Sequence, residues 1–362
     1  MAQRRAFIVS GAAIVTAAAC SGREDTAYEN AARAVRGPVS ESANAPSALQ
    51  RELVRYATLA PSSHNTQCWA FQLGTGGITI LPDTLRRCPA VDPDDHHLYV
   101  SLGCAAENLV QAALAVGLHS DVAVDAARGN IHIALAATQA VRSPLFEAIP
   151  LRQCTRAEYD GRTVSAADLK LLEQAGTGPG VRPLLFTGRP QMEQILEYVT
   201  RANSAQIGDA AFMAELKSWI RFNARDALAT RDGLFSAASG SPTLPHWLGS
   251  LLLPVFMTAR SENGRYAQHV RSSSGLAVFV SDANDKAHWV EAGRCYERFA
   301  LQATALGMRN ALLNQPVEVA ALRPQFSAYL GLTTGRPDLV VRFGYGPATP
   351  RSLRRPVDAV LQ

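Results

Sequence analysis

The pattern of apolar and polar residues predicts two copies of one arrangement, a helix followed by a loop and a strand. In residues 46–73 the helical run "LQRELVRYATL" precedes the loop "APSSHNTQCW" and the strand-like "AFQL". In residues 165–187, Ser165 is placed to cap a helix, and the loop "GTGPGVRP" and the strand-like "LLFT" follow. Residues 103–118 and 293–308 are apolar at helical spacing and end at a glycine, as helices often do.

The two long apolar helices also align with each other without a gap. Identical residues recur at a constant offset: Gly103 and Gly293, Glu107 and Glu297, Ala113 and Ala303, Ala115 and Ala305, Gly117 and Gly307. Alanine-rich helices also resemble one another by chance, so the repeated helix–loop–strand unit is the independent support. We therefore predict two half-copies, residues 46–150 and 151–358, with a site at the joint between them. A helical, lid-like insertion is expected in the second copy, over about residues 189–272.

Residues 1–20, "MAQRRAFIVSGAAIVTAAAC", have the layout of an export signal peptide. The apolar run from Ala6 to Ala19 is shorter than the ~20 residues that span a bilayer. The "RRAFIV" start resembles a twin-arginine signal. Two outcomes fit: cleavage after the alanines, or a lipoprotein in which Cys20 carries the lipid. The sequence thus predicts an exported protein, periplasmic or anchored to a membrane through Cys20, with residues 21–45 as a polar linker.

Composition limits the partners. The chain has 362 residues, of which 47% are hydrophobic and 18% charged, enough for a substantial core. The formal charge is +4 and there is no basic block with interleaved aromatic residues, so nucleic acid is not an expected partner. Besides Cys20 there are five cysteines, without CxxC or metal-ligand spacing. We interpret most as buried small residues, although an exported protein could form one disulfide between a pair that the sequence does not name.

The loop "APSSHNTQCW" carries the most specific chemistry. Alone, its Pro, Ser and Asn residues are ordinary in a turn after a helix. As "LAPSSHNTQCWAF", it resembles the signature A-P-S-S-x-N-x-Q-P-W-x-F of the FMN-dependent nitroreductase family. Arg152, Thr155 and Arg156 stand where that family has an arginine motif, and the duplicated chain with the ending "GLTTGRPDLVVRFGYG" is similar to its Acg-like branch. The resemblance covers residues 46–358 apart from much of the insertion.

The resemblance implies an α+β nitroreductase-like fold, with mainly antiparallel mixed sheets flanked by helices and two pseudo-symmetric halves in one chain. In the family each flavin lies between two subunits, one giving the loop and the other the arginine motif. Here the second copy has lost the loop signature, which implies one FMN per chain; Cys68 and Cys154 replace the usual Pro and Ser. The implied cofactor-binding residues are Pro61, Ser62, Ser63, Asn65, Gln67, Arg152, Thr155, Arg156, Leu312, Leu313, Asn314, Arg351 and Arg354.

The residue types suit these roles. Arginine forks bind phosphate bidentately and stay protonated, which fits the two arginines of the motif and those of the tail "PRSLRRPVD". Loop hydroxyls and amides can bond the ribityl chain and the pyrimidine edge of a flavin. In the family, main-chain N–H groups in the region of Leu312 to Asn314 approach flavin N5. Because the flavin carries the hydride, no catalytic side chain is assigned.

Other chemistry has less support. The stretch "VDPDDHHLY" could suggest a metal, but Asp92, Asp94 and Asp95 fit better at the start of the following helix, so no metal is assigned. No nucleophile elbow, Rossmann or Walker motif is found. The leading hypothesis is a reductase of small electron-poor molecules such as nitroaromatics or quinones. The alternatives are a flavin-sequestering protein with little NAD(P)H-dependent turnover, and a relative that binds no flavin.

Overall fold

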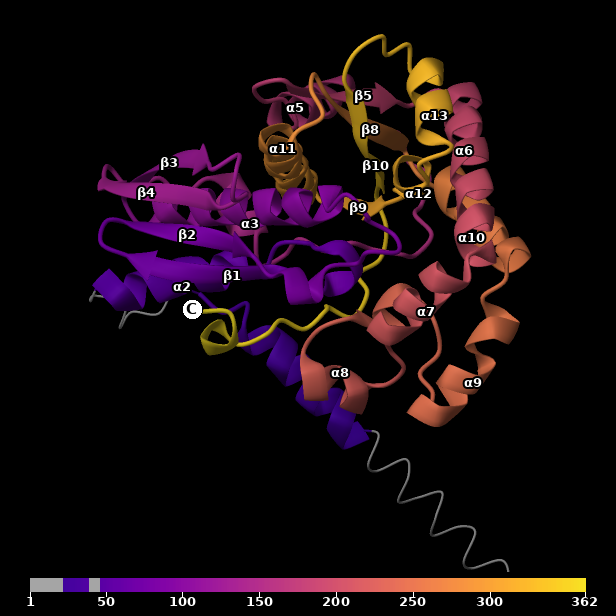
Figure 1. Ribbon diagram of the computed structural model, residues 1–362, viewed down its shortest axis with the longest axis horizontal. Coiled ribbons are helices and arrows are strands. Elements are labelled where there is room, and N and C mark those ends of the chain that lie inside the picture. Colours follow the sequence, from indigo (N-terminus) through magenta and orange to yellow (C-terminus); the bar gives the residue numbers. More distant parts are fainter. Residues whose placement is uncertain (1–21, 39–45) are drawn as a thin grey trace, which may run out of the picture.

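The computed structural model describes residues 22–38 and 46–362. The predicted signal peptide, residues 1–20 including Cys20, and residues 39–45 of the predicted linker lie outside the described residues. The described chain forms two four-stranded antiparallel sheets with helices between and around them (Figure 1). This confirms the prediction of an α+β fold with antiparallel sheets.

The first sheet comes from the first half of the chain. Its strands lie in the order β1 (Trp69–Gly74), β2 (Gly77–Pro82), β4 (Ile131–Ala137) and β3 (Leu118–Val124). Helix α3 (His96–Ala115) covers one face of this sheet, and α2 (Pro46–Ala57) and α4 (Pro144–Ala148) pack against α3. By length and apolarity α3 could cross a membrane, but 78% of its apolar window is buried inside the fold, as in a core helix.

The second sheet repeats the topology of the first. Its strands lie in the order β5 (Val181–Phe186), β8 (Gly275–Ser281), β10 (Arg336–Gly344) and β9 (Arg309–Leu312). Helix α11 (Lys286–Ala305) covers one face, with α5 (Ala166–Ala175) beside it. If the strands of each sheet are numbered from its own first strand, both sheets have the order 1-2-4-3. The shared order supports a duplication more strongly than the sequence alignment does.

The two halves meet where α3 crosses α11. Gly103 of α3 faces Val290, and Gly293 of α11 faces Val100, so the same contact is made twice with the roles exchanged. A methyl group on either glycine would lie 2.0 Å from the valine carbonyl oxygen opposite. Glycine is therefore required at both positions, because the helix backbones approach too closely for a side chain.

The segment between β5 and β8 is mainly helical. It holds α6 (Arg189–Gly208), α7 (Ala210–Trp219), β6 (Ile220–Arg221), α8 (Ala224–Thr230), β7 (Leu234–Phe235), η3 (Ala237–Ser239), α9 (His246–Phe256) and α10 (Ala259–Arg271). Two further short helices, α12 (Gln315–Glu318) and α13 (Arg323–Tyr329), connect β9 to β10. Helices α6 and α10 pack against each other beside the second sheet, whereas α8 and α9 lie at the lower end of the molecule (Figure 1).

The predicted linker is partly wrong, because residues 22–34 form a helix. Its sequence is polar overall, but Tyr28 and Ala32, one turn apart, are buried against Phe235 and Leu353. Tyr28 also donates its hydroxyl to the main-chain oxygen of Arg351. A stripe of only two buried residues is too narrow a signal for sequence periodicity to identify.

Two connecting segments cross between the sheets and position the site. The main chain of Thr155 and Cys154 lies along β9, where the Thr155 amide donates to Asn310. The C-terminal tail returns to the first sheet, where Val360 and Gln362 bond the main chain of Phe71 in β1. The short helices η1 (Ser63–Asn65), η2 (Thr84–Arg86) and η4 (Val357–Ala359) lie in the adjoining loops.

Candidate functional site

A cavity of about 80 Å³ lies where the loop after α2, the segment 152–156, the tail and the insertion meet. Parts of the chain that are far apart in sequence thus converge on one small space, with Arg36 and Leu312 in addition to these four. Its lining residues are Arg36, Pro61, Ser62, Asn65, Arg152, Gln153, Cys154, Arg156, Leu234, Phe235, Ala238, Ser239, Leu312, Arg351, Ser352 and Arg354.

The loop after α2 is held in an unusual backbone conformation. His64, Asn65 and Gln67 have φ of 48°, 54° and 54°, in the left-handed region that non-glycine residues seldom occupy. The strain is balanced by side-chain bonds: Ser62 Oγ accepts from the Gln67 amide at 2.9 Å, and Asn65 Nδ2 donates to the Gly233 carbonyl at 3.0 Å. Such concentrated strain is typical of functional loops.

The side chain of Gln67 does not face the cavity. It is fully buried, donates to the Arg231 carbonyl and accepts from the Arg355 amide. Gln67 thus ties the loop to the insertion and to the tail, a structural role in place of the predicted contact with cofactor.

Two buried arginines hold the end of α2. Arg354 donates to the carbonyl oxygens of Thr58, Leu59 and Ala60, the last turn before the loop. Arg152 donates to the Leu59 carbonyl at 2.7 Å and forms an ion pair with Glu297 at 3.0 Å. Because these guanidinium groups satisfy main-chain oxygens and a carboxylate, both arginines have a structural function whatever the cavity binds.

The cavity carries an excess of positive charge. Among the described residues, five arginines line it and no acidic residue does; Glu297, behind Arg152, is the carboxylate paired with one of these arginines. Burial, followed by the charge of Arg152, lowers the pKa of Arg354 to about 10. Burial and the neighbouring guanidinium groups also lower the pKa of Arg36. Crowded cations of this kind are stabilised by an anion placed between them, and arginine forks are suited to phosphate.

The structure brings eight of the predicted site residues to this cavity, namely Pro61, Ser62, Asn65, Arg152, Arg156, Leu312, Arg351 and Arg354. Ser63, Gln67, Thr155, Leu313 and Asn314 do not line it. The Leu313 amide, one of the main-chain groups expected near flavin N5, instead donates to the Val340 carbonyl, and the Asn314 side-chain Oδ1 accepts from the Val340 amide. These groups are used to join β9 to β10. Thr155 is buried, and its amide is bonded to Asn310.

Sequence reasoning missed the residues that cover the cavity. Leu234, Phe235, Ala238 and Ser239 come from the insertion, and Arg36 follows the helix at residues 22–34. Arg156 Nη1 lies 3.4 Å from Ser239 Oγ, so the arginine motif and the insertion are in contact. No local motif marks these residues, because only the folding of the insertion over the joint brings them near the loop. We call residues 234–239 the strap.

The corresponding place in the other half is filled by side chains. Arg298 donates to the carbonyl oxygens of Ala175 and Thr177 at the end of α5, as Arg354 does at the end of α2. Glu107, the counterpart of Glu297, pairs with both Arg294 and Arg298. Gly178, in the loop that lost the signature, lies so close to Glu291 and Arg298 that a methyl group there would be 2.2 Å from Glu291 Oε1. The two joints are therefore chemically different.

The residues present fit one part of an FMN molecule and not the other. The guanidinium groups around the cavity suit its phosphate. A volume of about 80 Å³, however, is well below the roughly 300–1,000 Å³ of typical ligand pockets, so the flavin ring has no room while the strap is in place. The five cysteines in the described part of the chain are free, and Cys154 lines the cavity.

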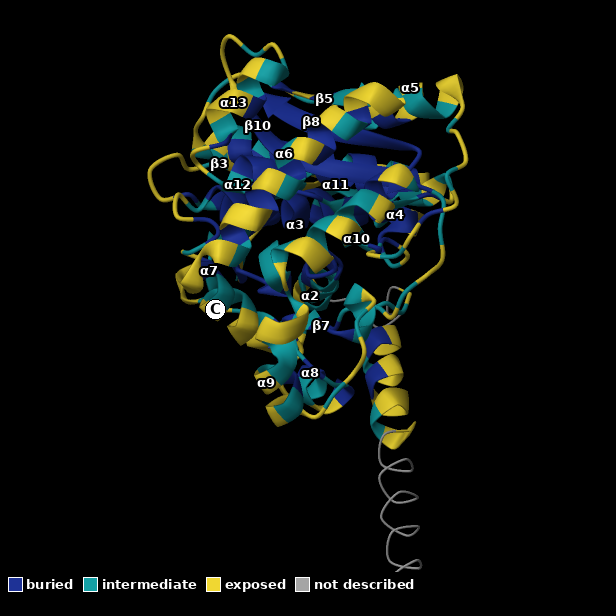
Figure 2. Cartoon of the chain, turned by 90° about the vertical axis from the view of Figure 1, so that its right-hand side faces the viewer, coloured by how far each residue is buried: buried dark blue, intermediate teal, exposed yellow. Residues whose placement is uncertain are grey.

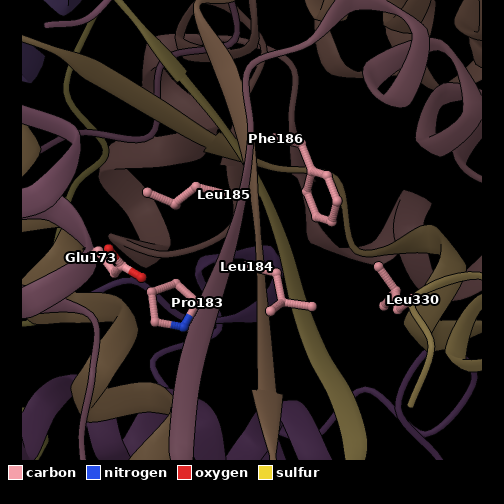
Figure 3. Close-up of a pocket in the computed structure, with 6 residues that line it drawn as sticks. All are labelled: Glu173, Pro183, Leu184, Leu185, Phe186 and Leu330. Atoms are coloured by element: carbon pink, nitrogen blue, oxygen red, sulfur yellow. The ribbon is translucent and has the colours of Figure 1, made fainter. Parts of the chain in front are cut away.

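A larger hollow of about 410 Å³ lies beside β5, the outer strand of the second sheet (Figure 3). It is lined by Glu173, Pro183, Leu184, Leu185, Phe186 and Leu330. It shares no residue with the predicted site and offers a single charged group, so it lacks the convergent polar groups of a specific site.

The stretch "VDPDDHHLY" behaves as predicted at its first aspartate, because Asp92 accepts from the His97 and Leu98 amides at the start of α3. Ligand atoms of Asp92, His96 and His97 nevertheless lie within 4.8 Å of one another. His96 Nε2 bonds Asp338 Oδ1 at 2.9 Å, and both side chains are fully buried. The geometry is that of a buried histidine–carboxylate pair at a helix start.

The His96–Asp338 pair leads to a pH prediction. Burial raises the pKa of Asp338 to about 7 and lowers the pKa of His96. Between about pH 4 and 6.5 the folded pair holds one proton on Asp338 and the unfolded chain holds one on His96, so the contribution of this pair to stability does not change with pH there. In Asp338→Asn the folded pair holds none, so relative to the unchanged protein the free energy of unfolding should fall by about 1.4 kcal/mol for each pH unit below 6.5.

Urea denaturation at pH 5, 6 and 7 measures this difference. The matched control is Asp121→Asn, which removes the carboxylate from an exposed pair with His119 and should not change the pH profile. Parallel pH profiles for Asp338→Asn and the unchanged protein would contradict the assignment.

Comparison with known proteins gives a consistent picture. No family model matches the chain. Two proteins of Mycobacterium tuberculosis, from strains CDC 1551 / Oshkosh and ATCC 25618 / H37Rv, are each 23% identical over 342 residues, covering 90% of this chain and 95% of theirs. Both are named for an NAD(P)H nitroreductase activity.

Several solved structures are also similar. The FMN-dependent nitroreductase of Mycobacterium smegmatis, in complex with NADPH, matches with a TM-score of 0.39 at 15% identity, covering 60% of this chain and 91% of that one. A nitroreductase of Bacteroides fragilis with bound FMN has a TM-score of 0.34 at 16% identity, covering 57% and 89%. These structures cover about 60% of this chain, whereas the sequence similarity to the two Mycobacterium tuberculosis proteins covers 90% of it.

Proposed function

We propose that this protein is an FMN-binding oxidoreductase of the nitroreductase type, of the Acg-like branch, with one flavin per chain. The observation that carries the proposal is the cluster of five arginines around the cavity at the joint of the two halves, without an acidic residue in its lining. It lies where the resemblance places a flavin phosphate, and the other joint is filled by an Arg298–Glu107 ion pair. The names of the two mycobacterial relatives support the reductase class.

In this proposal, bound flavin supplies hydride transfer to small electron-poor molecules such as nitroaromatics or quinones. The chain's own residues bind the phosphate, hold the loop after α2 in its strained conformation and exclude water beneath the strap. Because the cavity is about 80 Å³, the strap must move for the ring to enter. The absorbance spectrum of the purified protein tests flavin binding, and no band at about 450 nm after incubation with FMN and removal of the unbound flavin would reject it.

A second function is favoured by the strap itself. Leu234, Phe235 and Ser239 line the cavity, and its volume of about 80 Å³ leaves little room for a nicotinamide donor beside a flavin. A protein that stores or sequesters flavin with little NAD(P)H-dependent turnover would have such a restricted site. Anaerobic mixing separates the two functions: bleaching of the flavin by NADH or NADPH supports the reductase, whereas bleaching by dithionite alone supports the store.

Arg156 should contribute to flavin affinity without contributing to stability. Its side chain is exposed, forms no ion pair in the described part of the chain and contacts Ser239 at the cavity. We expect Arg156→Ala to weaken FMN binding by about 1.5–3 kcal/mol, the size of a charge-assisted hydrogen bond, while the unfolding midpoint stays the same. Fluorescence titration with FMN measures the affinity.

Arg182→Ala is the matched control for Arg156→Ala. Arg182 is exposed on β5, pairs with Asp282 and lies outside the cavity. Equal FMN affinity in Arg156→Ala and in the unchanged protein would remove Arg156 from the site.

We also propose that residues 1–20 direct export by the twin-arginine route, giving a periplasmic protein or a lipoprotein anchored through Cys20. The arginine pair, the apolar run and the small residues before Cys20 support it. The single chain would act as a pseudo-dimer, as its repeated strand order suggests. A reporter fused to residues 1–20 that is exported equally well with Arg4 and Arg5 replaced by lysine would argue against this route.

A further inference from the structure

Helix α9 exposes an apolar face. Trp247, Leu251 and Val255 follow one another at helical spacing and are 69%, 66% and 65% exposed, and Phe256 beside them is 66% exposed. Gly249 is the buried residue of this helix, and it packs on the ring of Phe222. The helix is therefore held along one edge, with its large apolar side chains directed away from the fold.

The sequence around α9 is also unusual, because it lacks charged residues over a long stretch. Residues 233–259 contain no Asp, Glu, Lys or Arg, in a chain that is 18% charged. Exposed apolar patches on soluble domains mark interaction sites, and interfaces with other proteins normally carry a polar rim. A helix without Asp, Glu, Lys or Arg and with a Trp in its first turn fits the boundary between lipid headgroups and acyl chains better, because Trp prefers that layer.

The position of α9 in the fold also supports contact with a membrane. In Figures 1 and 2, α9 and the amino end of the helix at residues 22–34 both lie at the lower end of the molecule. The sequence before that helix is the apolar run from Ala6 to Ala19, followed by Cys20. The part of the chain best suited to meet a membrane thus joins the fold at the end where α9 is exposed.

We propose that α9 is a membrane-docking helix that lies in the interfacial layer of a phospholipid bilayer. It has 11 residues, so at ~1.5 Å per residue it is far shorter than the ~30 Å hydrocarbon core and lies on the membrane without spanning it. Trp247, Leu251, Val255 and Phe256 enter the acyl boundary. Stable anchoring normally takes two attachments, and α9 supplies one besides the N-terminal segment. The inference does not depend on flavin binding.

The test uses the full chain and vesicles of phosphatidylcholine with phosphatidylglycerol. Leu251→Glu combined with Val255→Glu should weaken vesicle binding at least ten-fold in a flotation assay, because two charges enter the acyl boundary. Both positions are exposed, so the fold should be unaffected, and circular dichroism checks this. The matched control is Leu85→Glu, at a leucine that is 94% exposed on η2, and its binding should be unchanged.

A second readout separates α9 from the N-terminal segment. Brominated lipids should quench Trp247 and vesicles should shift its emission to the blue, as measured by the difference from Trp247→Phe. Vesicle binding without quenching of Trp247 would mean that the N-terminal segment alone binds, which overturns the proposal. Equal binding of the double glutamate variant also overturns it. So does light scattering that shows a dimer broken by the glutamates, because a second copy would then cover α9.

Discussion

Replacing Gly103 by alanine is expected to destabilise the protein by about 3 kcal/mol or more, the upper range for overpacking a tight contact. The new methyl group would lie 2.0 Å from the Val290 carbonyl oxygen and 3.1 Å from Gly293 Cα, and both neighbours are backbone atoms of a buried helix. Neither can rotate away, so α3 and α11 must move apart. Because this crossing joins the two halves, we expect the whole unfolding transition to shift to lower denaturant.

Two comparisons sharpen this prediction. Gly293→Ala should cost a similar amount, because its methyl group would lie 2.0 Å from the Val100 carbonyl oxygen. Gly264→Ala, in α10 with nothing within 4 Å of the added methyl group, should instead stabilise by up to about 1 kcal/mol. Chemical denaturation followed by circular dichroism measures all three. A Gly103→Ala protein as stable as the original would show that the helices do not cross as described.

Arg152→Met is expected to cost about 3–5 kcal/mol, because it leaves Glu297 as a buried carboxylate without its partner. The side chains of Arg152 and Glu297 are 3% and 0% exposed. The Leu59 carbonyl keeps a donor in Arg354, so the loss reports mainly on Glu297. The double variant Arg152→Met with Glu297→Leu should recover most of the loss, since an apolar pair replaces the ion pair.

The loss of stability in Arg152→Met should depend on pH. Burial already raises the pKa of Glu297 to about 7, and without Arg152 it should rise further. The carboxyl is therefore protonated at pH 5, and the loss in Arg152→Met should be smaller at pH 5 than at pH 8. The control Arg182→Met, in an exposed pair, should change stability by no more than about 0.5 kcal/mol. A single Arg152→Met variant with unchanged stability would show that the ion pair is not formed.

The variants Arg152→Met and Arg156→Ala separate a structural role from a role in binding. Arg152 and Arg156 belong to one motif in the sequence, and both were assigned to phosphate. In the structure, Arg152 is buried and its guanidinium serves Glu297 and Leu59, whereas Arg156 is exposed beside the strap. We therefore expect Arg152→Met to reduce stability and Arg156→Ala to reduce flavin affinity. Residue type and spacing could not distinguish the two, because burial is decided by what packs around each of them.

The limits of sequence reasoning show at particular residues. Pro61, Ser62 and Asn65 of the loop signature line the cavity, because the motif fixes the local backbone; their contact with a flavin stays a prediction. At Leu313, by contrast, the main-chain amide expected to face the flavin is bonded to the Val340 carbonyl of β10, and the neighbouring Asn314 side chain is bonded to the Val340 amide. Those bonds depend on a strand far along the chain, and local pattern does not report on them.

The sequence by itself determined the mixture of helices and strands, the repeat and the arginine-rich chemistry of one joint, since propensity, periodicity and motif are local properties. Tertiary structure alone decided that the strap lines a cavity of about 80 Å³, that Arg298 and Glu107 fill the opposite joint, and that the helix at residues 22–34 packs on the insertion. The physical reason is that burial and close approach arise from contacts between segments hundreds of residues apart, such as Asn65 with Arg354. The amino-acid sequence specifies which side chains are present, and packing decides which of them remain free to bind a ligand.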